Sequence, residues 1–242
     1  MLTQDRLKSF VLRRGRITSN QKRALEDLWD KFILNEDNIL DNSWSKGLSA
    51  LDIGFGSGET TIHLAKENPE MSILGAEVYL SGIGSLLSKA NEKALDNIKI
   101  LNADIVPFLN DKVKDNSFDI ILMFYPDPWP KRKHHKRRLL QKDFINLVNQ
   151  KLRPDGIFYF KTDWSHYFTE AKKLLLDNQH WQLLRKEDVY VNIGAEILRI
   201  YPSILHMFLA VGIHQQAAKS QKQIIHTLEV LCFAALDRTS LC

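Results

Sequence analysis

The chain has 242 residues, of which 44% are hydrophobic and 26% are charged, and its formal net charge is +4. These values are ordinary for a globular protein and allow one sizeable α/β domain with a short extension. Only two cysteines occur, Cys232 and Cys242. They exclude a disulfide framework and a Cys-x-x-Cys metal site, and they fit a reducing compartment.

No stretch of the sequence predicts membrane insertion. Residues 1–16 alternate charges with short apolar pieces and lack the apolar core of a signal peptide. The most apolar stretch, Ser203–Ile213, is far shorter than the roughly 20 residues of a membrane span. We therefore expect a cytoplasmic protein without membrane contact.

Strands and helices are predicted to alternate after a polar, basic N-terminal extension (residues 1–45) that contains a helix at Ser19–Leu34. The five predicted strands are the apolar runs Leu48–Ile53, Ser72–Glu77, Asn97–Leu101, Phe118–Phe124 and Gly156–Lys161. The predicted helices are Thr60–Glu67, Gly82–Leu95, Val106–Leu109, Lys136–Lys151 and Trp164–Leu176. Such alternation predicts parallel βαβ units, and hence a Rossmann-like, mostly parallel sheet with helices on both faces over residues 46–192.

A glycine-rich turn follows the first predicted strand and opens a helix. Gly54, Gly56 and Gly58 have the spacing that lets a backbone turn sharply and approach a ligand closely. Because the next residue is Glu59, the dinucleotide fingerprint G-x-G-x-x-G fails. A carboxylate at this helix N-terminus would oppose a diphosphate but tolerate a zwitterionic sulfonium. The turn therefore favours S-adenosylmethionine.

Two acidic residues end the next two predicted strands. Glu77 lies about 20 residues beyond the glycines, where an acid can accept both hydroxyl hydrogens of a ribose. Asp104 follows the third strand and could reach an adenine amino group, although by itself it is better explained as a helix cap. Since open α/β sheets bind ligands at the carboxyl ends of their strands, these positions together predict a cofactor pocket.

A proline-rich loop follows the fourth strand. Pro126, Pro128 and Pro130 fix φ and forbid a helix, so the loop should be rigid and should hold Asp127 and Trp129 above the cofactor. Trp129 is equally consistent with a wall of the pocket and with a buried aromatic side chain.

Six cationic residues and two histidines occupy the eight positions after this loop, residues 131–138. A charge run is usually a solvated helix face, but this one adjoins the predicted pocket and could neutralise a nucleic-acid backbone. His134 and His135 have no third ligand nearby in the sequence, so we interpret them as basic-patch residues and expect no metal. Asp163, after the fifth strand, could cap the next helix, face the substrate, or do both.

These motifs together resemble the bacterial tRNA guanine-N7 methyltransferase family, from about Arg13 to Val191. The Pro-Asp-Pro-Trp-Pro-Lys loop and the following His-Lys-Arg-Arg (residues 126–131 and 135–138) are the most specific parts. Supporting pieces are Arg14-Gly-Arg-Ile-Thr18 with Gln21, Gly75-Ala-Glu77-Val, and Thr162-Asp163-Trp164.

The resemblance implies methylation of guanosine 46 in the tRNA variable loop, with S-adenosylmethionine as methyl donor. It assigns cofactor contacts to Asp52, Glu77, Asp104 and Asp127, beside Gly54, Gly56 and Gly58, and it makes Asp127 the catalytic residue. Lys131 and Asp163 match substrate-binding positions. We add to them Trp129, Arg132, His135, Arg137 and Arg138 from the loop and the basic run. Where the family commonly has Glu, this chain has the shorter Asp52.

The C-terminal tail, residues 193–242, departs from the family. The family ends with a Thr-x-x-Glu element, whereas Thr227 and Thr239 are the only threonines after Val191 and neither has Glu three residues on. Only seven of the 50 tail residues are charged, against 55 of the preceding 192. Either this member has diverged or its reading frame has shifted near residue 192, which would deprive the sheet of its last strands.

Three other functions compete with this interpretation. The chain could methylate another RNA, a protein or a small molecule, although the basic run argues against a small molecule. It could be a catalytically impaired tRNA-binding protein, which the unusual tail makes plausible. A nicotinamide dehydrogenase is disfavoured by the missing third-position glycine. We expect a monomer or a weak homodimer.

Overall fold

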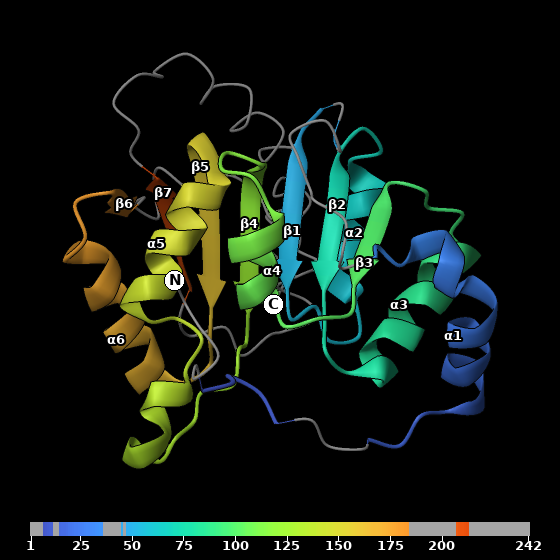
Figure 1. Ribbon diagram of the computed structural model, residues 1–242, viewed down its shortest axis with the longest axis horizontal. Coiled ribbons are helices and arrows are strands. Elements are labelled where there is room, and N and C mark those ends of the chain that lie inside the picture. The colour runs from blue at the N-terminus through green and yellow to red at the C-terminus, as the bar shows by residue number, and fades with distance from the viewer. Residues whose placement is uncertain (1–6, 12–14, 36–44, 46, 184–206, 213–242) are drawn as a thin grey trace, which may run out of the picture.

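The computed structural model describes residues 7–11, 15–35, 45, 47–183 and 207–212. Its centre is a seven-stranded sheet in the order β3-β2-β1-β4-β5-β7-β6 (Figure 1). The strands are β1 (Ser49–Ile53), β2 (Ser72–Ala76), β3 (Ile98–Leu101), β4 (Phe118–Phe124), β5 (Leu152–Lys161), β6 (Trp181–Leu183) and β7 (Met207–Gly212). Only β7 runs antiparallel to its neighbours. The predicted Rossmann-like, mostly parallel sheet is confirmed.

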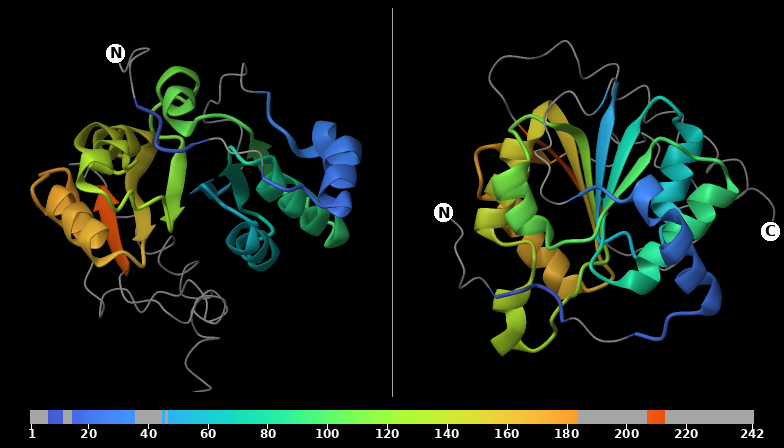
Figure 2. Two further views of the ribbon diagram at one scale, coloured as in Figure 1. Left: turned by 90° about the horizontal axis from the view of Figure 1, so that it is seen from below. Right: turned by 45° about the vertical axis from the view of Figure 1, so that its right-hand side comes forward.

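Six α-helices and one 3₁₀ helix accompany the described strands. They are α1 (Ser19–Phe32), α2 (Glu59–Glu67), α3 (Leu80–Glu92), α4 (Ile105–Lys112), the 3₁₀ helix η1 (Arg132–Arg137), α5 (Lys142–Lys151) and α6 (Ser165–Leu176). The α-helices cover both faces of the sheet, as Figure 2 shows. One core lies between the sheet and α4, α5 and α6, and the other between the sheet and α1, α2 and α3. No helix in the described part of the chain is both long enough and apolar enough to span a membrane.

The predicted helix at Lys136–Lys151 is wrong at its start. Residues 132–137 form the separate 3₁₀ helix η1, and α5 begins only at Lys142. The chain is diverted between them because Arg138 turns inward and is 2% exposed, while the backbone N–H of Leu140 donates to Tyr167 Oη at 3.0 Å. Tertiary contacts therefore override a helical charge pattern.

Helix α1, within the N-terminal segment, packs directly on the domain. Its Ala24 and Phe32 belong to the second core, and it lies along α3. A Cβ on Gly84 of α3 would come within 2.8 Å of the Gln21 carbonyl oxygen, so glycine is required for the two helices to approach this closely.

Strand β7 lies inside the stretch that the sequence marks as atypical. It pairs antiparallel with β5 from Ile157↔Val211 to Lys161↔Met207, and with β6 on its other side. A strand therefore occupies residues 207–212 of the tail, which completes the sheet beside β5. The other tail residues, 193–206 and 213–242, lie outside the described part of the chain.

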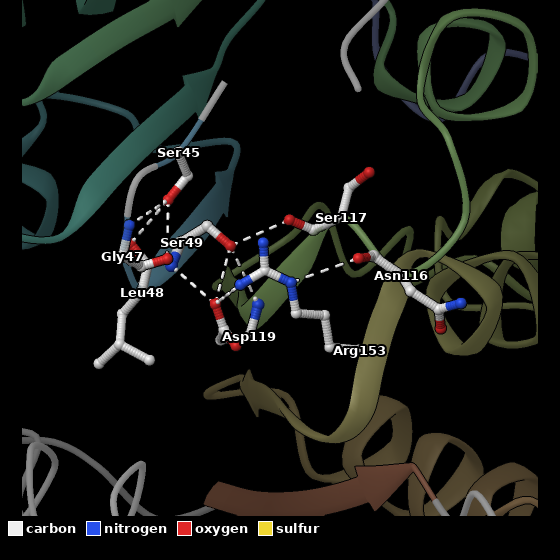
Figure 3. Close-up of polar contacts among 8 residues, drawn as sticks. All are labelled: Ser45, Gly47, Leu48, Ser49, Asn116, Ser117, Asp119 and Arg153. Atoms are coloured by element: carbon white, nitrogen blue, oxygen red, sulfur yellow. Dashed lines mark hydrogen bonds and ion pairs between the residues drawn. The ribbon is translucent and has the colours of Figure 1, made fainter. Parts of the chain in front are cut away.

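A buried polar cluster joins the amino ends of β1, β4 and β5, at the sheet edge opposite the predicted pocket (Figure 3). Asp119 Oδ2 accepts hydrogen bonds from the backbone N–H of Ser49 at 2.8 Å and from Arg153 Nη1 at 2.6 Å. Asp119 is 5% exposed and Ser49 is fully buried. One carboxylate thus links three strands.

We predict that Asp119→Ala lowers the free energy of unfolding by about 2 kcal/mol, because it leaves a buried N–H and a half-buried guanidinium without their acceptor. Urea denaturation measures the change. Glu26→Ala, which removes only an exposed ion pair with Lys22, is the control and should change stability by less than about 0.5 kcal/mol. Equal effects of the two substitutions would contradict a structural role for Asp119.

Candidate active site

Two adjoining cavities open at the carboxyl ends of β1, β2, β3 and β4. The first has a volume of about 280 Å³ and is lined mainly by apolar side chains, together with Glu77, Asp104 and Asp127. The second, of about 370 Å³, is lined by Asp52, Thr60 and Asp163 among others. Both are bordered by the backbone of Gly54 and Gly56. The structure therefore brings five predicted acids, Asp52, Glu77, Asp104, Asp127 and Asp163, together around Gly54 and Gly56.

The backbone conformation of the turn explains why glycines occupy it. Gly54, Gly56 and Gly58 have φ values of +70°, +58° and +80°. Residues with a Cβ atom rarely adopt this left-handed conformation. A Cβ on Gly54 or Gly56 would meet nothing within 4 Å, so these two face open space at the cavities. A Cβ on Gly58 would lie 2.8 Å from Leu86, and Gly58 lines neither cavity. The structure gives Gly58 a packing role, which corrects its expected place in the pocket.

Glu77 fastens this turn to the end of β2. Its Oε2 accepts the N–H of Gly56 at 3.0 Å, and its Oε1 accepts the N–H groups of Val78 at 2.7 Å and Tyr79 at 3.1 Å. Burial raises the pKa of Glu77, and the three backbone donors act in the opposite direction. The carboxylate both shapes the first cavity and lines it.

Asp52 is the buried acid of the second cavity and is 2% exposed. Burial raises its pKa to about 7, even though the Thr61 hydroxyl donates to Oδ2 at 2.7 Å and lowers it; nearby Glu77 contributes a smaller upward shift. A cationic ligand beside Asp52 would favour the ionised form. This side chain is therefore suited to bind a positive group.

Asp104 is a helix cap that also borders the first cavity. Its carboxylate accepts the Val106 N–H at 3.2 Å and so caps α4. It also lines the first cavity, together with Asp127 of the proline loop. A cap hydrogen bond and contact with a ligand are compatible, because a carboxylate has several acceptor positions.

Glu59 does not act as the sequence suggested. Its carboxylate is ion-paired with Lys89 of α3, which also donates to the Ser57 carbonyl oxygen at 2.8 Å. Glu59 is thus neutralised by Lys89 and does not border the cavities. The acids that border the cavities are Asp52, Glu77, Asp104, Asp127 and Asp163.

The proline loop contains no helix, as predicted, and Trp129 lines neither of the two cavities. Its backbone has a φ of +42°. Its indole Nε1 donates to the carbonyl oxygen of Ser9 at 2.9 Å, and its ring stacks edge-on against His134 with centroids 5.7 Å apart. Arg137 lies over the same ring, 5.1 Å from its centroid. Trp129 thus connects the loop, the basic helix and the N-terminal segment.

Most of the predicted basic patch lies on the surface. Lys131, Arg132, Lys133 and Lys136 are exposed, and Arg137 is half-buried at Trp129. Arg138 is the exception. Its guanidinium is ion-paired with Glu170 of α6, and its Nε donates to the Pro128 carbonyl oxygen at 2.7 Å. Its expected contact with substrate is corrected: Arg138 anchors the proline loop and η1 to α6.

The fold also supplies the neighbours that His135 lacked in the sequence. His135 Nδ1 and His166 Nε2 lie 3.7 and 3.8 Å from Glu170 Oε1, so the three could in principle share a cation. Arg138 Nη1, however, ion-pairs with the same carboxylate and lies 3.1 Å from His166 Nδ1. If that nitrogen accepts from the guanidinium, Nε2 of a neutral ring carries the proton and is not a free ligand. We interpret the group as a hydrogen-bonding network.

The sequence interpretation missed two buried groups beside the site. Lys161 ends β5, is 1% exposed and lies 5.5 Å from the centroid of the Tyr125 ring; burial lowers its pKa to about 8. Tyr167 supports the backbone at Leu140, and burial raises its pKa. The position of Lys161 next to Asp163 at a strand end was the available signal for the first. Tyr167 carried no local signal.

Comparison with known proteins assigns the family. Residues 46–227 match the family described as "Putative methyltransferase". The tRNA (guanine-N(7)-)-methyltransferase of Colwellia psychrerythraea is 38% identical over 178 residues, which are 72% of this chain and 72% of that protein. The enzyme of the same name from Nitrosococcus oceani is 39% identical over 186 residues, or 74% and 78% of the two chains. This chain belongs to the tRNA (guanine-N7-)-methyltransferase family.

A further relative agrees with this membership. A tRNA (guanine-N(7)-)-methyltransferase from Pseudomonas putida is 42% identical over 166 residues, covering 67% of this chain and 69% of that one. Among solved structures, TrmN from Thermus thermophilus aligns with a TM-score of 0.49 at 16% identity, over 80% of this chain and 48% of that chain. The family match continues to residue 227 and so extends beyond residue 192.

Asp52 should make the stability of this methyltransferase depend on pH. Between the ordinary pKa of Asp and about 7, the folded state holds a proton that the unfolded chain releases, so the free energy of unfolding should fall as pH rises through this range. The total loss is of the order of 4 kcal/mol for three pKa units. Asp52→Asn does not titrate, so its stability relative to wild type should grow from pH 4 to 7 and then level off.

Urea denaturation of wild type and Asp52→Asn from pH 4.5 to 8.5 measures this difference. Asp96→Asn, on the exposed surface, is the control and should follow wild type. Parallel profiles for Asp52→Asn and wild type would show that Asp52 titrates as a solvent-exposed acid.

Proposed function

We propose that this protein transfers a methyl group from S-adenosylmethionine to N7 of guanosine 46 in the variable loop of tRNA. The observation that carries the proposal is that two features adjoin each other. A pair of acidic cavities borders the glycine turn, and a rigid loop beside them leads into the basic 3₁₀ helix η1. The family relationship supports the same reaction, since the relatives are named for guanine-N7 methylation of tRNA.

The two cavities suit the two halves of S-adenosylmethionine. The apolar walls of the first, such as Ile105 and Met123, fit an adenine ring, while Glu77 and Asp104 offer acceptors for ribose hydroxyls and the adenine amino group. Asp52 offers a buried carboxylate in the second cavity for a cationic amine. The charged side chains that line the two cavities are all carboxylates, which would repel a diphosphate. The residues therefore fit a zwitterionic sulfonium better than a dinucleotide.

The exposed cations suit the tRNA backbone. Lys131 and Arg132 are exposed and follow directly on the loop that carries Asp127, while the half-buried His135 and Arg137 lie further along η1. Lysine and arginine contacts to phosphates position a nucleic acid without reading its sequence. Asp163 lines the second cavity and is exposed, so it is placed to contact a guanine that enters from the basic side.

Methyl transfer to N7 needs alignment more than a strong base. The N7 lone pair forms the new bond to the methyl carbon, the carbon–sulfur bond breaks with its electron pair passing to sulfur, and the positive charge moves to the guanine ring. The protein needs to hold the ring in line, which proximity and orientation accelerate. Carboxylates near the ring would accept its N–H groups and stabilise the developing charge. Asp127 is our candidate for this role, supported by Asp163.

Asp127→Ala should reduce kcat at least about 100-fold, because it removes the carboxylate that stabilises charge during transfer. Binding of S-adenosylhomocysteine should weaken far less, since Glu77, Asp104 and Asp52 are unchanged. Turnover of tRNA and calorimetric titration measure the two effects separately. Asp143→Ala, an exposed acid on α5, serves as control, and near-normal kcat in Asp127→Ala would remove Asp127 from the mechanism.

The proposed substrate and position are tested together by labelled methyl transfer to two unmodified tRNA transcripts, one with guanosine 46 and one with adenosine there. We expect label only in the first. Label in both would place the methylated base elsewhere. No label in either, with S-adenosylhomocysteine still bound, would favour the alternative of a catalytically impaired tRNA-binding protein.

The unusual C-terminal tail is the observation that supports the alternative of a catalytically impaired tRNA-binding protein. It lacks the Thr-x-x-Glu element and is poor in charge. We propose two explanations for these features, divergence of this family member and a frame shift near residue 192. Resequencing the gene across codons 185–200 tests the frame shift, and an intact frame in independent isolates would refute it. We further propose that the protein acts in the cytoplasm as a monomer or weak homodimer, without a metal.

A further inference from the structure

The N-terminal segment Leu7–Val11 borders the first cavity. Ser9 and Phe10 line that cavity together with Glu77, Asp104 and Asp127, although they precede the nearest of these by more than 60 residues. In Figures 1 and 2 the segment, drawn in dark blue, runs along the edge of the sheet where the parallel strands end. A piece of chain from outside the sheet therefore forms one wall of the pocket.

Two side chains from opposite sides of the cavity hold this wall. Trp129, on the loop after β4, donates from Nε1 to the Ser9 carbonyl oxygen at 2.9 Å. Tyr79, at the start of α3, donates from Oη to the Val11 carbonyl oxygen at 2.9 Å. The two bonds bracket Phe10, which lines the cavity.

Packing alone does not explain the position of the segment. Leu7 is 41% exposed and Val11 is 42% exposed, and Ser9 and Phe10 are half-buried, so packing holds the segment only in part. Two hydrogen bonds from side chains to its backbone add to this packing. Their donors are themselves held by the site: Tyr79 gives its N–H to Glu77, and Trp129 lies two residues after Asp127.

We propose that Ser9 and Phe10 form the outer wall of the adenosine half of the cofactor site, and that Trp129 and Tyr79 are the positioning residues of that wall. This inference rests on the proposed function. On this proposal, residues 7–11 must move away before the cofactor can leave. Because Trp129 of the Asp127 loop holds the wall, the position of that loop is coupled to the position of the wall. Phe10 offers an aromatic surface of the kind that stacks on a purine.

The test uses variants that keep each aromatic ring and remove only its donor, Trp129→Phe and Tyr79→Phe, in the full chain. Each should raise the dissociation rate of S-adenosylhomocysteine roughly fivefold, the effect of one ordinary hydrogen bond. The association rate should change little. The double variant should dissociate faster than either single variant. Stopped-flow displacement measures these rates, and Trp29→Phe, on α1, is the matched control.

Hydrogen exchange supplies a second readout that a merely structural effect would not give. In wild type, S-adenosylhomocysteine should protect the amides of residues 7–11, and the double variant should lose this protection while the amides of β1 and β4 keep theirs. If Tyr79→Phe fails to fold, Trp129→Phe alone decides the matter.

If the wild-type protein binds S-adenosylhomocysteine, and the variants show the same dissociation rate and the same amide protection as wild type, the proposed role of Ser9 and Phe10 as a wall is wrong. A wild-type protein that does not bind S-adenosylhomocysteine would overturn the proposed function itself, and the wall with it. The two failures are thus distinguishable in one set of measurements.

Discussion

The carboxylate of Glu77 is the constraint on which the site depends. It accepts three backbone N–H groups, one from the glycine turn after β1 and two from the start of the segment that leads into α3. Charge-assisted hydrogen bonds of this kind offset the cost of burying a carboxylate that is only 7% exposed. The close approach is completed by Gly82, where a Cβ would lie 2.3 Å from the Gly56 carbonyl oxygen. Glu77 and Gly82 thus fix the glycine turn that borders both cavities.

A second constraint fixes the substrate side. The basic run carries more positive charge than any other stretch of the chain, and repulsion within it would favour a loosely held loop. Arg138 removes this difficulty, because its guanidinium is buried against Glu170 and the carbonyl oxygen of Pro128. Arg138 therefore has a structural role, and the exposed cations of the basic run remain at the surface, where they can bind a polyanion. This division of labour fits a protein whose net charge is only +4.

The cofactor side and the substrate side meet where β1 and β4 lie next to each other. The sheet order changes direction there, with β2 and β3 on one side of the pair and β5 on the other, and ligands bind at such points in open α/β sheets. The acids of the first three strands and the loop after the fourth face the same space for this reason. The N-terminal segment adds a covering that the sheet itself does not supply.

Local sequence pattern was enough to determine the five parallel strands, the glycine turn and the convergence of Asp52, Glu77, Asp104 and Asp127. The reason is that apolar periodicity reports local structure, and parallel strands end at one edge wherever they lie in the sequence. The tertiary structure alone decided which partner each polar group found. Arg138 reaches Glu170 across 32 residues, Lys89 reaches Glu59 across 30, and Trp129 reaches Ser9 across 120. Such pairings depend on how helices and segments pack together, and no pattern within a short window contains that information.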